Sequence, residues 1–164
     1  MNLIDRIKAG QVINELELEK DITKPWGAYI TFARNTECTS KILIVTNELS
    51  VQAHQQRDEM WYLVAGRAAI YRGKIMDSVE STIANLEPTI VSPGDLLYIP
   101  RTTVHTAVNL GKSPAIFIET SLGHAQEDDI QRFYDKHGRA KLEGYPSGIN
   151  IADLISLCKS RLNG

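Results

Sequence analysis

Four side chains that could hold a metal ion lie in two short segments of the sequence. Gln52, His54 and Glu59 belong to the first segment, and His105 belongs to the second. One amide, two imidazoles and one carboxylate form a nitrogen and oxygen ligand set that suits a divalent first-row metal. We therefore predict a metal site if the fold brings these two segments together.

The spacing within the first segment fits β-strands. Alternate residues of a strand face the same side, so Gln52 and His54 point together, and Glu59 shares its side with Trp61. Each His or Glu alone is more often a surface or hydrogen-bonded residue. The joint pattern, with Gly and Pro at fixed offsets, favours ligands that converge inside a barrel.

The elements that must position these residues are short strands between Trp26 and about Thr120. Gly, Pro and Asn residues separate them at turns, and nothing indicates alternating strands and helices. Many short strands of this kind predict an all-β sandwich or barrel. The predicted strands are 28–32, 41–46, 50–54, 60–65, 68–71, 89–91, 95–99, 105–109 and 115–119.

The sequence changes character on both sides of the predicted barrel, which we assign to residues 24–127. Residues 1–23 read as an N-terminal lead-in, with a short possible helix at 3–9. Residues 128–164 read as a C-terminal helical extension packed on the barrel, with apolar stripes over 128–137 and 151–162. The second stripe could instead cover a dimer partner.

Composition limits the class of protein. The chain has 164 residues and a net charge of −2, so we expect one domain and no nucleic-acid or anionic-membrane partner. No apolar run is long enough to span a membrane, and no signal pattern begins the chain. Cys38 and Cys158 fit neither zinc nor redox spacing. These features predict a soluble, cytoplasmic protein, with a disulfide left open.

The two segments resemble the two motifs of the cupin superfamily. They read Gln52-x-His54-x4-Glu59-x6-Gly66 and Gly94-x5-Pro100-x-Thr102-x2-His105-x3-Asn109. The resemblance implies a cupin-type double-stranded β-helix, also called a jelly-roll barrel. Two positions depart from the usual pattern, because Gln52 replaces a first His and Thr102 replaces a Gly.

A longer resemblance links the chain to the cupin domain of type II phosphomannose isomerases. The matching stretches are Lys24-Pro25-Trp26-Gly27-Ala28-Tyr29, Lys41-Ile42, Leu49-Ser50-Val51-Gln52-Ala53-His54, Arg57-Asp58-Glu59-Met60-Trp61, Tyr98-Ile99-Pro100, Glu127-Asp128-Asp129-Ile130 and Gly138-Arg139. It implies zinc held by Gln52, His54, Glu59 and His105, and interconversion of mannose 6-phosphate and fructose 6-phosphate through an enediol. Met60 stands where the family has a His, and residues 123–126 form a shorter loop without the family's Tyr.

The resemblance also points to residues that would contact a sugar phosphate. Arg57, Lys41 and Arg139 are the candidates for binding the phosphate, and Trp61 could stack on the sugar. Arg57, Lys41 and His124 are the candidates for catalysis, His124 as a proton-transfer group. The alternatives are solvated surface positions for the charged residues and His124, and core packing for Trp61.

We therefore predict a zinc-dependent, homodimeric mannose-6-phosphate isomerase whose partner is a small sugar phosphate. One alternative is a cupin that binds a sugar or sugar phosphate without turnover, which Met60 and the altered loop favour. Another is an iron dioxygenase, against which the amide ligand Gln52 counts. Metal analysis would separate zinc from iron.

Overall fold

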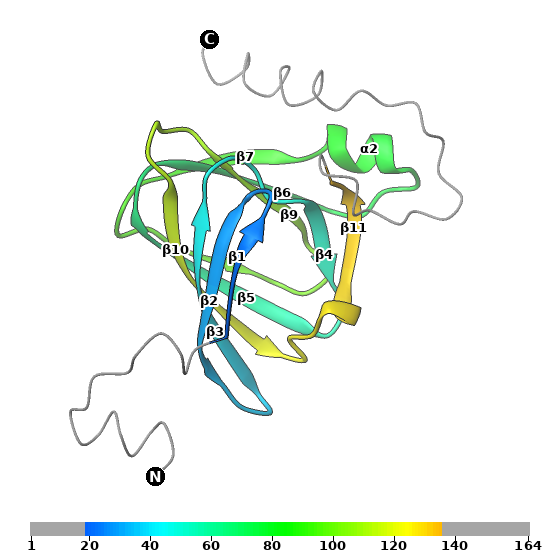
Figure 1. The fold of residues 1–164 in the computed structure, drawn as a ribbon. Helices are drawn as coiled ribbons and strands as arrows, with labels where there is room; N and C mark the ends of the chain where they lie inside the picture. Colours follow the sequence, from blue (N-terminus) through cyan, green and yellow to red (C-terminus); the bar gives the residue numbers. More distant parts are fainter. Residues whose placement is uncertain (1–18, 136–164) are drawn as a thin grey trace, which may run out of the picture.

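The computed structural model describes residues 19–135, whose strands form two antiparallel sheets that face each other across a shared interior (Figure 1). This arrangement confirms the predicted all-β, cupin-type barrel. Among the described residues, no helix is long and apolar enough to cross a membrane. The predicted cytoplasmic location stays a prediction.

The first sheet has six strands in the spatial order β1-β2-β3-β10-β5-β8. Their bounds are β1 Glu19–Lys24, β2 Gly27–Arg34, β3 Cys38–Val45, β10 Ala115–Gly123, β5 Arg57–Ala65 and β8 Leu96–Ile99. A Cβ at Gly27, which has φ 139°, would lie 1.8 Å from the carbonyl oxygen of Ile44. Only glycine therefore fits this turn between β1 and β2.

The second sheet has five strands in the spatial order β11-β4-β9-β6-β7. Their bounds are β11 Ile130–Tyr134, β4 Val51–His54, β9 Val104–Asn109, β6 Ala68–Gly73 and β7 Glu87–Val91. A 3-10 turn, η2 Glu127–Asp129, directly precedes β11. β4 lies between β9 and β11, so each edge of this short strand has a partner.

The core lies between the sheets and follows the alternation of the strands. In β5 and β10 every second side chain is buried, which is the pattern of strands with one inward face. The buried apolar residues of the main cluster are Trp26, Leu43, Val45, Leu49, Trp61, Leu63, Ala68, Ile70, Val91, Ile99, Ala107, Ala115 and Phe117.

One short helix, α2 Val79–Ala84, was not predicted from the sequence. Ser78 caps its N-terminus by accepting a hydrogen bond from the Ser81 backbone, and the Ser81 hydroxyl accepts one from the Ser78 backbone. Val79 and Ile83 pack against β4 and β11 in a second apolar cluster. α2 accordingly lies beside β11 in Figure 1.

The helix predicted from residue 128 is wrong over its described part. Ile130 pairs with His54 and Arg132 with Gln52, so this segment is the edge strand β11. Five residues of mixed polarity are compatible with the periodicity of a helix and with that of a strand. The unpaired backbone groups of β4 favour the strand, because they form hydrogen bonds with these residues. The proposed helices at 3–9 and 151–162, with Arg139 and Cys158, lie outside the described residues. Strands β1 and β11 extend the sheets beyond the predicted limits of 24 and 127.

Candidate metal centre

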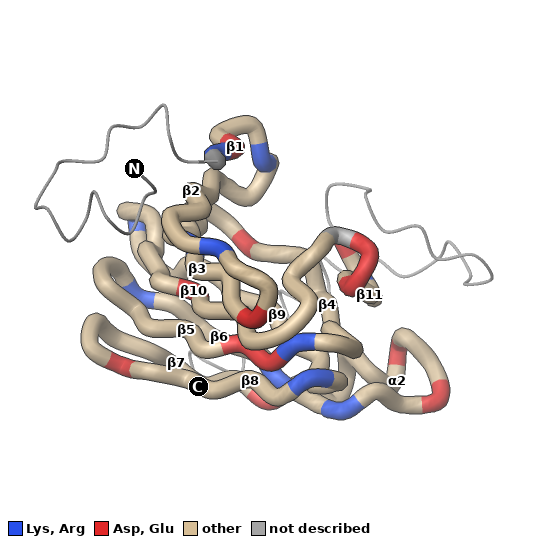
Figure 2. Tube along the Cα trace, turned by 90° about the horizontal axis from the view of Figure 1, so that it is seen from below, with Lys and Arg blue, Asp and Glu red and all other residues tan. Residues whose placement is uncertain are grey.

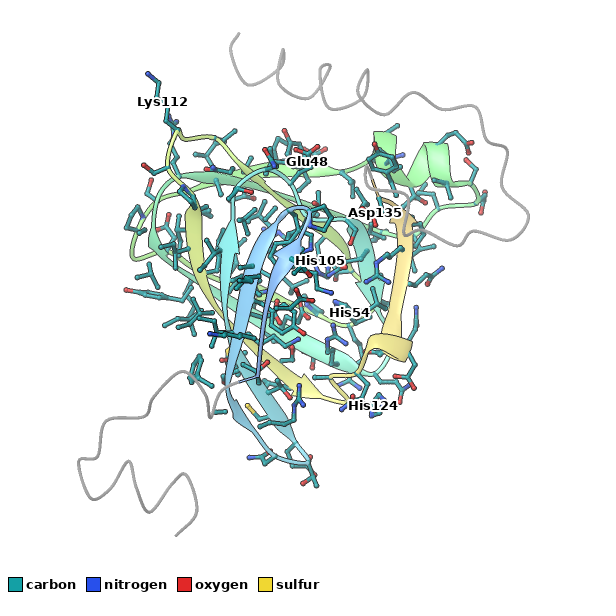
Figure 3. All side chains as sticks on the ribbon, in the orientation of Figure 1. Glu48, His54, His105, Lys112, His124 and Asp135 are labelled. Atoms are coloured by element: carbon teal, nitrogen blue, oxygen red, sulfur yellow. The ribbon has the colours of Figure 1, made fainter. Side chains whose placement is uncertain are left out.

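Three of the four predicted ligands meet between the two sheets. Their ligand atoms lie within 4.8 Å of one another, and none of the residues is more than 2% exposed. His54 ends β4, Glu59 lies in β5, and His105 lies in β9. Figure 3 shows His54 and His105 pointing into the interior of the barrel.

The distances in this cluster fit a bound ion. His54 Nε2 lies 3.1 Å from Glu59 Oε1, and His105 Nε2 lies 3.3 Å from Glu59 Oε2. Two ligand atoms that each lie about 2.0–2.2 Å from an ion are roughly 2.8–3.1 Å apart at octahedral angles and roughly 3.3–3.6 Å apart at tetrahedral angles. The donor set therefore has the spacing that a divalent metal requires.

The tautomer of His105 also fits. Its Nδ1 lies 2.9 Å from the Thr103 carbonyl oxygen, which can only accept, so Nδ1 carries the proton. Nε2 then presents a lone pair to the cluster, and this buried atom makes no hydrogen bond. A ligating histidine is oriented in the same way by a hydrogen bond from its other nitrogen.

Gln52, the predicted fourth ligand, lies beside the cluster opposite His105 in the register of β4 and β9. Its amide nitrogen is 3.5 Å from His54 Nε2, and its Oε1 accepts a hydrogen bond of 2.9 Å from Ser50 Oγ. An amide flip exchanges these two atoms and would turn the oxygen toward the cluster. Gln52 is thus placed to serve as a ligand after that rotation.

Trp61 supports the carboxylate of Glu59 from the core. Its indole nitrogen donates a hydrogen bond of 3.1 Å to Glu59 Oε2, and its ring meets the His105 ring edge-on at 5.4 Å. The side chain is buried, so this residue follows the core-packing alternative and not the sugar-stacking one.

Arg57 is a buried positioning residue. Its Nε donates to Glu59 Oε1 at 2.9 Å, and its Nη1 lies 3.4 Å from Asp129 Oδ2. The other oxygen of Asp129 accepts hydrogen bonds of 2.9 Å from the backbone of Gln55 and Gln56. This chain of contacts fixes the turn between β4 and β5 to the η2 turn. Asp129 is therefore a clamp on this turn, because its carboxylate joins Arg57 to the backbone of Gln55 and Gln56.

The charge states of the cluster follow from its burial. Burial raises the pKa of Glu59, but the close contacts with the His105 and His54 rings outweigh it and hold that pKa well below its ordinary value. Burial lowers the pKa of His54, against an opposing hydrogen bond with Glu59. An ionised carboxylate beside a neutral imidazole is the state that binds a cation.

A cavity of about 110 Å³ opens beside the cluster. It is lined by Gln52 and Arg57 from the metal end, and by several further charged side chains. These are Lys24, Lys41, Glu119 and Arg132. Lys41, a predicted substrate-binding residue, therefore faces the same space as the cluster.

Sequence reasoning missed two residues of this site, Glu119 and Ser121 of β10. Ser121 Oγ lies 3.4 Å from both Glu59 Oε1 and Glu119 Oε1. Burial and the nearby charge of Glu59 raise the pKa of Glu119 to about 7. The alternation of Ala115, Phe117 and Glu119 in the predicted strand was a signal that a carboxylate faces inward.

His124 and Met60 lie away from the cluster. His124 is 44% exposed and is 3.0 Å from Asp128 on the surface, at the lower edge of the barrel in Figure 3. Met60 lies on the outer face of β5, between Tyr98 and Thr120. The residue at position 60 therefore does not face the metal ligands, and its departure from the family pattern leaves them intact.

Comparison with known proteins agrees with the fold and with the family resemblance. A family model described as "Mannose-6-phosphate isomerase C-terminal" matches residues 11–135. The mannose-1-phosphate guanylyltransferase ManC of Salmonella typhimurium is 33% identical over 84% of this chain and 26% of its own length. The xanthan biosynthesis protein XanB of Xanthomonas campestris is 32% identical over 77% of this chain and 25% of its own length. The chain thus spans about a quarter of the length of these relatives.

Solved structures share the fold at low sequence identity. The capsular polysaccharide assembling protein CapF of Staphylococcus aureus has a TM-score of 0.59 and 17% identity, over 69% of this chain and 33% of that one. An RmlC-like cupin from Shewanella frigidimarina has a TM-score of 0.54 and 19% identity, over 71% of this chain and 92% of that chain. The cupin fold is therefore shared.

The curated relatives correct the predicted activity. The relative from Salmonella typhimurium and one from Escherichia coli are named mannose-1-phosphate guanylyltransferases, and the matching family model describes a C-terminal domain. They are not type II isomerases, so the predicted interconversion of mannose 6-phosphate and fructose 6-phosphate is wrong.

Proposed function

The chain belongs to the family of mannose-6-phosphate isomerase C-terminal domains, and from this premise we propose that it is a metal-binding cupin domain that holds a mannose phosphate in its lumen. We further propose that it serves guanylyl transfer to mannose 1-phosphate, as part of such an enzyme or beside one. The names of the curated relatives support this second step.

The observation that carries the proposal is a buried metal-ligand cluster beside a cavity with cationic walls. His54, Glu59 and His105 supply the ligands, and zinc is the ion that we propose for them. When bound, such an ion polarises an oxygen of the ligand. Lys41 and Arg132 line the cavity, where ammonium and guanidinium groups suit a phosphate.

The size of the cavity supports a small ligand. About 110 Å³ accommodates part of a monosaccharide that enters from the open end, whereas sites for whole drug-sized ligands span roughly 300–1,000 Å³. A mannose phosphate therefore suits this space better than a complete nucleotide sugar.

The experiment combines metal analysis with ligand titration. The chain is loaded with zinc, manganese or iron, its metal content is measured by mass spectrometry, and mannose 1-phosphate and mannose 6-phosphate are titrated by calorimetry. We expect one ion per chain, and binding of a mannose phosphate by the loaded protein.

Two histidine variants make the test specific. His105→Ala should lose metal affinity by at least a hundredfold and lose ligand binding with it, whereas the surface variant His124→Ala should behave as wild type. The proposal fails if the loaded protein binds neither mannose phosphate at millimolar concentration. Retention of iron with consumption of oxygen would revive the dioxygenase alternative instead.

The predicted homodimer stays part of the proposal. The outer faces of β5 and β8 expose Tyr62, Leu96 and Tyr98, and Tyr62 pairs with Leu96 across the two strands. Exposed apolar faces of this kind are common at protein interfaces. Analytical ultracentrifugation of wild type and Leu96→Asp checks this surface, and a dimer unaffected by the substitution would place the interface elsewhere.

A further inference from the structure

Glu119 faces the cavity but does not belong to the metal-ligand cluster. Its side chain comes from β10 and is 6% exposed, and the residue is part of the cavity wall. Among residues 19–135, its carboxylate accepts one hydrogen bond, from Ser121 Oγ at 3.4 Å. A carboxylate with so little compensation is costly to bury, so its retention calls for a role.

Support of the metal cluster does not explain Glu119. The Ser121 hydroxyl has one proton, so it can donate to Glu59 or to Glu119 but not to both at once. The two carboxylates also repel each other across this serine. Within residues 19–135, no hydrogen bond or ion pair joins Glu119 to His54 or His105, so its carboxylate orients neither imidazole.

Lys41 lies opposite Glu119 and faces the same cavity. The two residues are register partners in β3 and β10, and Trp61 of β5 flanks Glu119 on the other side. Lys41 Nζ lies 5.1 Å from the centre of the Tyr29 ring, and no ion pair joins it to Glu119 in the described part of the chain. A cation and a carboxylate therefore line one small cavity without forming an ion pair with each other.

This arrangement suits a ligand that carries both an anion and hydroxyl groups. A hydroxyl donates to a carboxylate in a charge-assisted hydrogen bond, and an ammonium group attracts a phosphate. Inorganic phosphate has no sugar hydroxyl to donate, and its own P–OH groups belong to the anion whose charge this carboxylate repels. Specificity that combines an attractive and a repulsive contact is the usual way to separate similar ligands.

We propose that Glu119 and Lys41 form a second subsite of the lumen, in which Glu119 accepts a sugar hydroxyl and Lys41 binds the anion. Glu119 thereby distinguishes a sugar phosphate from inorganic phosphate. This inference rests on the proposed function, because it assigns groups of the mannose phosphate to particular walls of the same cavity.

The test compares two affinities in the zinc-loaded chain. Mannose 6-phosphate, mannose 1-phosphate and inorganic phosphate are titrated into wild type and Glu119→Gln, and metal content is measured in both. We expect the preference for the better mannose phosphate over inorganic phosphate to fall at least tenfold in the variant, with one ion still bound. Glu87→Gln, which removes the same charge from an exposed position on β7, should keep the wild-type preference.

Lys41→Met provides a second test of the subsite, and its result does not depend on whether Glu119→Gln folds. It should weaken binding of mannose phosphate and inorganic phosphate by similar factors, so the preference stays near that of wild type. If Lys41→Met lost the preference for mannose phosphate over inorganic phosphate, the separate roles proposed for Glu119 and Lys41 would be overturned.

The remaining outcomes separate the inference from the proposed function. If wild type binds a mannose phosphate and Glu119→Gln keeps the full preference, the second subsite is wrong and the proposed function stands. Loss of the ion from Glu119→Gln would make Glu119 a support of the metal cluster and would also overturn the subsite. If wild type binds neither mannose phosphate, the proposed function and the subsite fail together.

Discussion

Two ends of one lumen, built by the same strands, have opposite chemistry. β5 carries Leu63 into an apolar end, where Ile70, Val91 and Phe117 belong to the same cluster. Toward its other end, β5 carries Glu59 into the metal-ligand cluster beside the cavity. The backbone is continuous between the two ends, so the side chains alone make the difference.

The difference teaches where stability and chemistry reside in this barrel. Burial of an aliphatic or aromatic side chain stabilises by about 1.5–3 kcal/mol, so the apolar end favours folding. The polar end buries the carboxylates of Glu59, Glu119 and Asp129, which need partners to remain ionised. We therefore expect changes at the apolar end to affect unfolding, and changes at the polar end to affect ligand and metal binding.

The largest effect is expected at the apolar end. Leu63→Ala should lower the free energy of unfolding by about 3 kcal/mol, because it leaves a cavity in a site that is 1% exposed. Val64→Ala, at the adjacent outward position, should change it by less than about 1 kcal/mol. Urea unfolding monitored by circular dichroism gives both values, and equal losses would contradict the inward and outward assignment of β5.

At the polar end, ionisation of Glu119 should lower the free energy of unfolding as the pH rises. Burial and the charge of Glu59 raise the pKa of Glu119 from 4.5 to about 7, so the folded state binds this proton more tightly than the unfolded state. The contribution of Glu119 to the free energy of unfolding is therefore most favourable below pH 4.5 and becomes less favourable until about pH 7.

Comparison with Glu119→Gln isolates this effect. Relative to wild type, the metal-free variant should gain up to about 3 kcal/mol in the free energy of unfolding between pH 4.5 and pH 7.5. Urea titrations at several pH values measure the difference. A difference that does not change with pH would mean that Glu119 ionises normally in the folded chain.

A smaller effect is expected from the clamp on the turn between β4 and β5. Asp129→Asn keeps an oxygen for the backbone of Gln55 and Gln56 but loses the charge that faces Arg57. Metal affinity should fall about 10–100-fold, as it does when outer partners of metal ligands are removed. Competition with a chromogenic chelator measures this affinity, and Asp128→Asn on the exposed side of the same turn should match wild type.

The smallest effect concerns Thr102, which has φ 65° and whose backbone nitrogen donates to the His54 carbonyl oxygen. A β-branched residue is strained in this left-handed region, so Thr102→Gly should raise the free energy of unfolding by roughly 1 kcal/mol. Thr102→Ala keeps most of the strain and serves as the control. Thermal unfolding distinguishes them, and a less stable glycine variant would show that unfolded-chain entropy outweighs the strain.

The sequence was most informative where short-range alternation and motif spacing agree. Gln52, His54 and Glu59 lie close together in sequence, and strand parity predicted that Gln52 and His54 point together and that Glu59 shares its side with Trp61. His105 was the candidate ligand of the second segment, and the fold places it opposite Gln52 in the register of β4 and β9. The barrel and the position of the metal ligands could therefore be predicted before the structure.

Other features depend on contacts that the sequence does not display. Residues 130–134 suit a helix locally, but the free edge of β4 makes them a strand. Arg57 was expected at the substrate, yet its partners Glu59 and Asp129 hold it in the wall. Glu119 was visible as an inward position, but its isolation becomes apparent only when its neighbours are in place.

The clamp formed by Asp129 joins parts of the chain that are far apart in sequence. Its contact with Arg57 spans 72 positions, and its contact with Gln55 spans 74. Contacts of such length form late, because the entropy of closing the intervening loop must first be overcome. During synthesis from the N-terminus, the ligands His54, Glu59 and His105 all leave the ribosome before Asp129 does. The order of the chain therefore means that the turn between β4 and β5 cannot be clamped until residue 129 has been synthesised.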